Sequence, residues 1–138
     1  MSWIPQLRDE DEINNSGGLL LTKAKTLCIE RLNKPILNVI KDDHGAIAWK
    51  TNEFYLVAKS YVYGYIVSCH KELVDMALEN GFDIVMYIEK SDKFYRFNPK
   101  EIIEKHTINQ RAGIDMINFD IKLGTNMENI PHNMKENN

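Results

Sequence analysis

Residues 83–88, Asp-Ile-Val-Met-Tyr-Ile, form a short run that is apolar at almost every position. A strand of this composition is typical of the buried middle of a sheet, because a half-exposed strand alternates polar and apolar residues instead. Asn80 and Gly81 before the run and Ser91 and Asp92 after it are turn-forming residues. The sequence therefore predicts a fully buried strand here, with other elements packed around it.

Helical spacing marks the segment 19–33, where Leu21, Ala24, Cys28 and Leu32 recur at intervals of three and four residues. Pro35 would end this helix because proline cannot continue it.

A second helix is predicted to begin at Ser68, which is a good N-cap residue. It would carry Leu73, Met76 and Ala77 on one side and end at Asn80-Gly81. Pro99 would open a third, short helix that runs to residue 105.

Short runs rich in β-branched and aromatic residues predict the remaining strands. Turn residues separate the first three runs, at 42–45 and 51–52. Residues 61–67 fit either a further strand or an extended crossover. The predicted strands are residues 36–40, 46–50, 53–59, 83–88, 93–97 and 116–122. Strands interspersed with helices in this order predict an α/β fold, a mixed central β-sheet flanked by helices.

Charge and composition divide the chain into three parts. Residues 1–17 hold one arginine against four acidic residues, and the sequence predicts an acidic flexible tail there. Residues 123–138 are rich in asparagine and predict a polar C-terminal tail. The domain between them, residues 18–122, carries a net charge of +1 out of the chain total of −3. That balance is not the basic footprint of a dedicated nucleic-acid binder, although it allows a local basic patch.

The composition also indicates a compartment. No apolar run approaches the roughly 20 residues that a membrane-spanning helix needs, so we expect no membrane partner. The N-terminus lacks the pattern of a secretion signal. Cys28 and Cys69 are expected to be free thiols in a reducing cytoplasm, and neither has a partner at zinc-ligand spacing. We therefore predict a cytoplasmic protein.

Two tetrapeptides on successive predicted strands carry the main functional clue. They are Gly45-Ala46-Ile47-Ala48 and Leu56-Val57-Ala58-Lys59. Together with the order of elements over residues 19–89, they resemble the PD-(D/E)xK nuclease superfamily, and within it the archaeal Holliday-junction resolvases. The resemblance implies a restriction-endonuclease-like fold. In that superfamily two carboxylates on adjacent strands hold a divalent ion and a lysine steadies the attacking water or phosphate.

The departures from this pattern matter more than the match. Ala48 stands where the resemblance places an aspartate, and Val57 stands where it places a glutamate; Lys59 alone matches. A site without both carboxylates should not bind Mg²⁺, so no cofactor and no catalysis are expected. The resemblance then implies a nuclease-like domain that acts by binding nucleic acid, DNA or RNA.

Four basic residues, Lys50, Lys59, Arg96 and Arg111, are the candidates for that contact. Tyr61, Tyr63 and Tyr65 alternate along the chain and could add a surface on which bases stack. The interpretation favoured from sequence is that these tyrosines pack within a sheet.

Two alternatives remain open. The first is an active, Mg²⁺-dependent endonuclease in which Asp43 and Glu53 replace the missing acids and act with Lys59. The sequence favours a hairpin turn for Asp43 and an exposed strand end for Glu53. The second is a protein-interaction module unrelated to nucleases, in which these charges are solvated surface. A homodimer would fit the resolvase resemblance.

Overall fold

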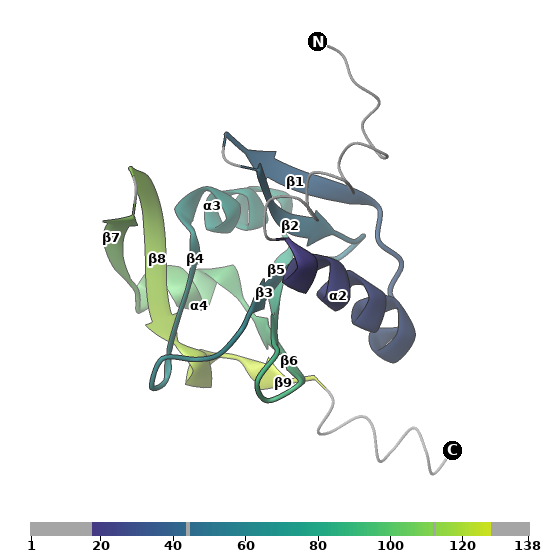
Figure 1. The fold of residues 1–138 in the computed structure, drawn as a ribbon. Coiled ribbons are helices and arrows are strands. Elements are labelled where there is room, and N and C mark those ends of the chain that lie inside the picture. The colour runs from purple at the N-terminus through teal and green to yellow at the C-terminus, as the bar shows by residue number, and fades with distance from the viewer. Residues whose placement is uncertain (1–17, 44, 112, 128–138) are drawn as a thin grey trace.

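A computed structural model describes residues 18–43, 45–111 and 113–127 (Figure 1). The helical elements are α2 (Leu19–Leu27), a π-helical turn η1 (Cys28–Leu32), α3 (Lys71–Asn80), α4 (Pro99–Glu104) and a 3₁₀ turn η2 (Ile121–Leu123). The strands are β1 (Asn38–Asp42), β2 (Gly45–Lys50), β3 (Phe54–Lys59), β4 (Ile66–His70), β5 (Asp83–Ile88), β6 (Lys93–Phe97), β7 (Thr107–Arg111), β8 (Ile114–Asp120) and β9 (Thr125–Asn126). Within these residues no helix is both long and apolar enough to cross a membrane.

The strands form two sheets. The larger sheet has the order β1-β2-β3-β5-β6-β9, in which β3 and β5 are parallel and every other pair is antiparallel. The smaller sheet, β4-β8-β7, is antiparallel throughout. The fold is therefore α/β with a mixed central sheet, as the sequence predicted.

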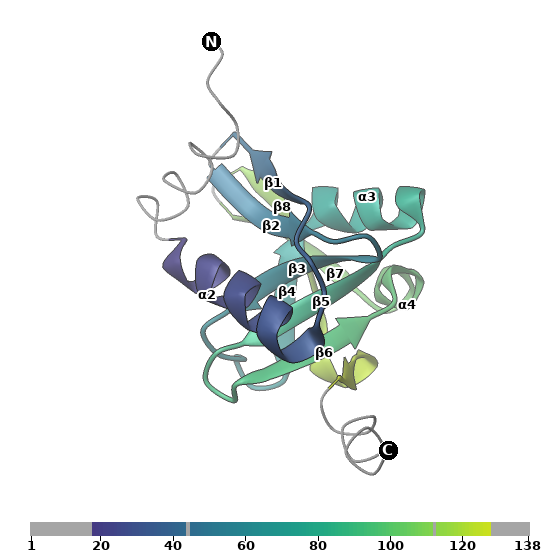
Figure 2. The ribbon, with the colours of Figure 1, turned by 90° about the vertical axis from the view of Figure 1, so that its right-hand side faces the viewer.

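Helix α2 covers one face of the larger sheet (Figure 2). Its residues Leu21 and Ala24, with Cys28 of η1, form a buried cluster with side chains of β2, β3, β5 and β6. They are three of the four residues whose spacing predicted the helix, and the fourth, Leu32, packs against the same cluster. The apolar stripe therefore indicated the buried side correctly. Trp49 fixes the helix further, because its indole Nε1 donates a hydrogen bond to the Leu21 carbonyl over 3.0 Å.

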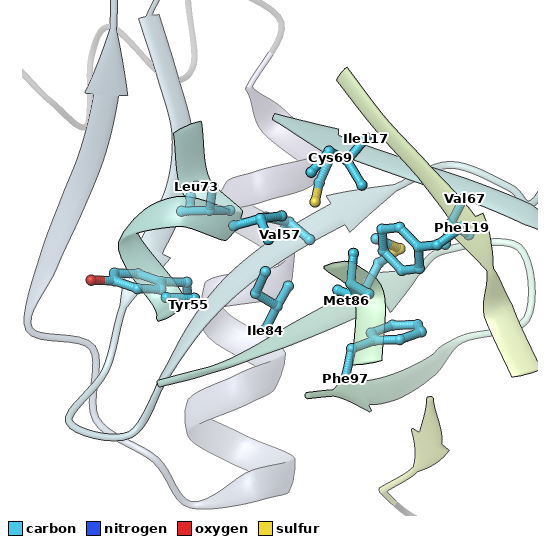
Figure 3. Packing of buried hydrophobic residues seen from close by; sticks show 14 of the residues in the cluster. Tyr55, Val57, Val67, Cys69, Leu73, Ile84, Met86, Phe97, Ile117 and Phe119 are labelled. Carbon is cyan, nitrogen blue, oxygen red and sulfur yellow. The ribbon is translucent and has the colours of Figure 1, made fainter. Parts of the chain in front are cut away.

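The other face of the larger sheet carries α3, α4 and the smaller sheet, which together enclose the second cluster (Figure 3). Strand β5 supplies Ile84, Met86 and Ile88 to this cluster, whereas the alternate residues Val85 and Tyr87 belong to the α2 side. Every residue of β5 from Ile84 to Ile88 is buried. The central strand predicted from the sequence is thus confirmed.

Strand β4 shows where local signals misled the prediction. The helix expected to begin at Ser68 begins at Lys71, and residues 66–70 are a strand. Val67 and Cys69 lie opposite Phe119 and Ile117 of β8, and all four are buried. Burial of these apolar side chains outweighs the capping preference of Ser68, whose stabilising effect is only about 1 kcal/mol.

The C-terminal part also differs from the prediction. Strand β7 was not foreseen, β8 begins two residues earlier than predicted, and β1 is displaced two residues toward the C-terminus. Strand β9 lies within the segment assigned to the polar tail and pairs with Tyr95 and Arg96 of β6. Two residues leave no periodicity to detect, so only the tertiary pairing reveals this strand.

Gly124, between η2 and β9, tests whether this segment belongs to the packed domain. A Cβ atom there would lie 2.6 Å from Cε2 of the fully buried Phe97 ring. The backbone of Gly124 has φ −96°, which alanine adopts without strain, so the effect of substitution is steric alone. We predict that Gly124→Ala lowers the free energy of unfolding by about 1–3 kcal/mol, measured by urea denaturation.

The matched control is the double variant Gly124→Ala with Phe97→Leu, which removes the ring from the clash. Its destabilisation should be smaller than the sum of the two single effects. Additive effects would contradict the packing of Gly124 on Phe97.

Candidate nucleic-acid interface

Ala48 and Val57, the two positions where the resemblance places acids, lie on one side of the larger sheet. Trp49 pairs with Leu56 and Lys50 with Tyr55, and one step further along β2 and β3 are Ala48 and Val57. Both are buried in the cluster of Figure 3, where Val57 lies among the side chains of Ile84, Leu73 and Cys69. The two positions that would hold the acids are therefore part of the hydrophobic core.

Lys59 follows two residues after Val57 and ends β3. The two residues line one hollow of about 260 Å³ that also touches Cys69 and His70. Burial raises the pKa of the Cys69 thiol to about 12, so this cysteine stays protonated at neutral pH. Lys59 also lines a second hollow, on the side of the smaller sheet.

The acids proposed to replace the missing pair do not converge on Lys59. Glu53 precedes β3, at the end opposite Lys59, which places the two residues about 20 Å apart at roughly 3.3 Å per residue. Asp43 lies in the β1–β2 turn and lines a different hollow, together with Lys71 and Asp115. Among the residues that the structure describes, no three His, Cys, Asp or Glu side chains are grouped to hold a metal ion.

Glu53 instead belongs to a network of ion pairs. Its carboxylate accepts hydrogen bonds from Lys34 Nζ at 2.6 Å and from Arg96 Nη1 at 3.1 Å, and Arg96 Nε donates to Asp83 at 2.6 Å. The hydrogen bonds from Lys34 and then Arg96 hold the pKa of Glu53 below its usual value. This network joins the segment after η1 to β3, β5 and β6, which is a structural role.

The four basic residues selected from the sequence do not form one surface. Arg96 is engaged by Asp83 and Glu53, and Lys50 lies with its Nζ 5.8 Å from the centre of the Phe82 ring. Both lie toward the end of the larger sheet opposite Lys59. Arg111 ends β7, and its side chain lies outside the part of the chain that the structure describes.

The strongest surface feature lies beyond Lys59, in residues 60–65, which we call the tyrosine loop. It carries the chain from β3 of the larger sheet to β4 of the smaller one (Figure 1). The side chains of Tyr61, Tyr63 and Tyr65 are 57%, 81% and 59% exposed. The expectation that these tyrosines pack within a sheet is therefore wrong. The loop crosses between two sheets, and its rings project from a turn that contains Gly64 at φ +69°.

Backbone hydrogen bonds fix both ends of the tyrosine loop. The Lys90 N–H donates to the Ser60 carbonyl at 2.9 Å, and the Ile121 N–H donates to the Tyr65 carbonyl at 2.9 Å. The Tyr61 and Tyr63 rings lie 6.4 Å apart and are tilted by 57°. The loop thus holds exposed aromatic rings on an anchored backbone.

Three lysines surround the tyrosine loop. Lys59 precedes it, Lys90 lies beside Ser60, and the Lys122 Nζ lies 5.7 Å from the centre of the Tyr65 ring. Lys90 and Lys122 were missed by sequence reasoning. The parallel pairing of β3 with β5 brings Lys90 next to the loop, and that pairing is the signal that could have identified it. No local signal indicated Lys122.

The tyrosine loop and the smaller sheet border an open hollow of about 420 Å³, which we call the tyrosine hollow. Its lining residues come from the loop, from β4 and from β8: Lys59, Ser60, Tyr61, Tyr63, Ile66, Val67, Ser68 and Asn118. Ser68 lies opposite Asn118 in the β4–β8 pair, so both side chains leave the same, outward face of the sheet.

No protein-family model matches this sequence, and no curated protein matches it. Among solved structures, a nuclease from a fusselovirus was found, with a TM-score of 0.44 and 11% sequence identity. The alignment covers 92% of this chain and 91% of that chain.

The ion-pair network around Glu53 should make the stability of the fold depend on pH. Because the folded state lowers the pKa of Glu53, its carboxylate stabilises the fold at pH values above the unfolded pKa. This contribution is lost as the pH falls through the folded pKa. The wild type should therefore lose more stability between about pH 7 and pH 3 than the Glu53→Gln variant does, measured by urea denaturation.

Asp43→Asn is the matched control, because it removes a carboxylate in an exposed turn and leaves the Glu53 network intact. An equal loss of stability in the wild type and in Glu53→Gln would contradict a structural role for Glu53.

Proposed function

We propose that this protein binds single-stranded nucleic acid at the tyrosine loop. The observation that carries the proposal is the exposure of Tyr61, Tyr63 and Tyr65, each more than half accessible, beside three lysines. Aromatic rings of this size are normally buried, and exposed ones that gather in one place mark binding surfaces. Unpaired bases stack on such rings, and each stacked base contributes about 1–3 kcal/mol.

The distribution of charge around the tyrosine loop favours a short contact with a nucleic-acid backbone over a long one. Lys59, Lys90 and Lys122 can each meet a backbone phosphate, whereas nearby Glu89 is paired with Lys23 over 3.1 Å. The near-neutral balance of residues 18–122 argues against a long basic groove. A short single strand that combines stacking with about three phosphate contacts fits this surface best.

We also infer that binding has replaced metal-dependent cleavage. The inference rests on the resemblance of β2 and β3 to the PD-(D/E)xK pattern and on the core positions of Ala48 and Val57. Two adjacent carboxylates repel each other unless a cation lies between them, and burial in an apolar cluster adds a desolvation cost. Apolar residues at both positions remove that cost and the metal together.

Binding can be tested by fluorescence anisotropy with a labelled single strand of about 12 nucleotides at low salt. Tyr63→Ala should weaken binding about 5- to 150-fold, the equivalent of one lost stacking contact. Tyr63→Phe keeps the ring and should bind like the wild type. A duplex of the same sequence should bind more weakly, because its bases are already stacked on one another.

Salt provides a second measure in the same assay. Three lysine contacts to a single strand should give a slope of about −2 in log affinity against log salt concentration, reduced to about −1.4 in Lys90→Ala. Arg96→Ala is the matched control and should keep the wild-type slope, because Arg96 is engaged by Asp83 and Glu53. Absence of binding at low salt would contradict the proposal and favour a protein-interaction module.

Restoring the two acids tests the lost metal site. Ala48→Asp with Val57→Glu should lower the thermal midpoint when no metal is present, because two carboxylates enter the apolar cluster. Mn²⁺ should then raise the midpoint of this variant, since it binds only the folded site.

The uncharged pair Ala48→Asn with Val57→Gln has nearly the same shape and should not respond to Mn²⁺. If the acidic variant is folded and its midpoint is unchanged by Mn²⁺, these strands do not correspond to the nuclease motif.

A further inference from the structure

Charge is divided unevenly between the N-terminal segment and the domain that follows it. Residues 1–17, which lie outside the described part of the chain, hold Arg8 against four consecutive acidic residues at 9–12 and carry a net charge of −3. Residues 18–122 carry a net charge of +1. A concentrated negative segment is attracted to positive side chains within its reach. The place where the segment joins the domain therefore decides which lysines it can meet.

The segment joins the domain beside the tyrosine loop. Gly18 lines the hollow of about 260 Å³ that Lys59 also lines, and Lys59 borders the tyrosine hollow as well. Glu12 precedes Gly18 by six residues and Asp9 precedes it by nine, so an extended chain places these acids up to about 20–30 Å from Gly18. This reach exceeds the width of the hollow that contains Gly18 and Lys59. The tyrosine loop, which begins directly after Lys59, lies within it.

Two exposed lysines beside the tyrosine loop are suited to receive the acids. The backbone N–H of Lys90 donates to the Ser60 carbonyl, and the Lys122 Nζ lies 5.7 Å from the centre of the Tyr65 ring. Among the residues that the structure describes, neither lysine forms an ion pair. Both ammonium groups are therefore accessible to an anion from outside the domain.

The acidic residues next to these lysines in the chain are engaged elsewhere. Glu89, which precedes Lys90, pairs with Lys23 over 3.1 Å. The carboxylate of Asp120 accepts a hydrogen bond from the backbone N–H of Lys122 at 2.8 Å and so caps η2. Neighbouring side chains of the domain thus leave the positive charge beside the tyrosine loop largely uncompensated.

We propose that the acidic residues 9–12 dock on Lys90 and Lys122 and compete with a nucleic-acid strand for the tyrosine loop. The inference rests on the proposed function and adds an autoinhibitory contact to it. Carboxylates of the segment and phosphates of a strand bind the same ammonium groups. Each exposed ion pair is weak, but a short tether gives an effective concentration of the order of millimolar. A strand that combines stacking with phosphate contacts displaces the segment, whereas a strand that makes only phosphate contacts does not.

The contact can be tested without nucleic acid, by attaching a nitroxide spin label to the full chain at Gln6→Cys. Burial raises the pKa of the Cys28 thiol to about 11 and that of Cys69 to about 12, so neither native cysteine reacts readily with the label at neutral pH. Docking of the segment should broaden the NMR amide signals of residues 60–65 and of Lys90.

The control carries the same label and an uncharged segment, and most of the broadening should be lost in it. We call it the neutral-segment variant, and its changes are Asp9→Asn, Glu10→Gln, Asp11→Asn and Glu12→Gln.

Competition is measured by fluorescence anisotropy with a labelled single strand of about 12 nucleotides. Without the spin label, the neutral-segment variant should bind the strand about three- to tenfold more tightly than the wild type at low salt. Added salt should reduce this difference, because it screens exposed charges. In Lys90→Ala with Lys122→Ala, neutralising the segment should change the affinity by less than about twofold, since the two sets of changes remove the same contact.

Two matched controls separate docking from a general effect of charge. Lys100→Ala with Lys105→Ala removes two exposed lysines of α4 and its C-terminal end, and in this background neutralising the segment should keep its full effect. A second control neutralises four exposed acids of α3 and α4, which raises the net charge by the same four units, and should bind within about twofold of the wild type. Its changes are Glu72→Gln, Glu79→Gln, Glu101→Gln and Glu104→Gln. Thermal melts establish that each variant is folded.

The outcomes distinguish the docked segment from the proposed function. Broadening that survives in the neutral-segment variant overturns the docking and leaves single-strand binding intact. The same holds for an affinity that is unchanged in that variant, or that rises equally in the α3–α4 control. A wild type that binds no strand at low salt overturns single-strand binding and the competition with it, and the spin-label comparison still decides whether the acids meet the tyrosine loop.

Discussion

The fold depends on burying β5 on both of its faces. Val85 and Tyr87 contact the cluster under α2, and Ile84, Met86 and Ile88 contact the cluster on the opposite side. Each face of the strand needs its own cover, so α2 must pack on one side and α3, α4 and the smaller sheet on the other. Removing either cover would expose a row of large apolar side chains to water. Each exposed side chain would cost about 1.5–3 kcal/mol of stability.

The parallel pairing of β3 with β5 determines where the proposed binding surface lies. Parallel neighbours cannot be joined by a tight turn and need a long crossover, which in this chain passes through the tyrosine loop, β4 and α3. The loop leaves the larger sheet at Lys59, where the parallel strand β5 also ends and supplies Lys90. The aromatic rings and the lysines thus meet because of the topology of the crossover, at some distance from the network of Glu53 and Arg96.

Ala48 and Val57 belong to the hydrophobic cluster on the α3 side of the larger sheet. The cluster around them is closed by α3 and by β4, whose Leu73 and Cys69 are fully or almost fully buried. Two carboxylates at these adjacent positions would repel each other unless a cation lay between them. In this chain the same positions belong to the hydrophobic core, and Lys59 at the end of β3 lines both adjoining hollows.

The sequence by itself determined the α/β class, the buried strand Asp83–Ile88, the face of α2 that packs on the sheet, and the β1–β2 hairpin, because periodicity and turn residues are local signals. Only the tertiary structure decided that residues 66–70 form a strand, that Thr125–Asn126 joins the sheet, and that Tyr61, Tyr63 and Tyr65 are exposed. These outcomes depend on pairings between residues far apart in the chain, such as Cys69 with Ile117 and Tyr95 with Asn126. Because the stability of such a pair depends on both strands and on their burial, it cannot be predicted from the residues of one segment.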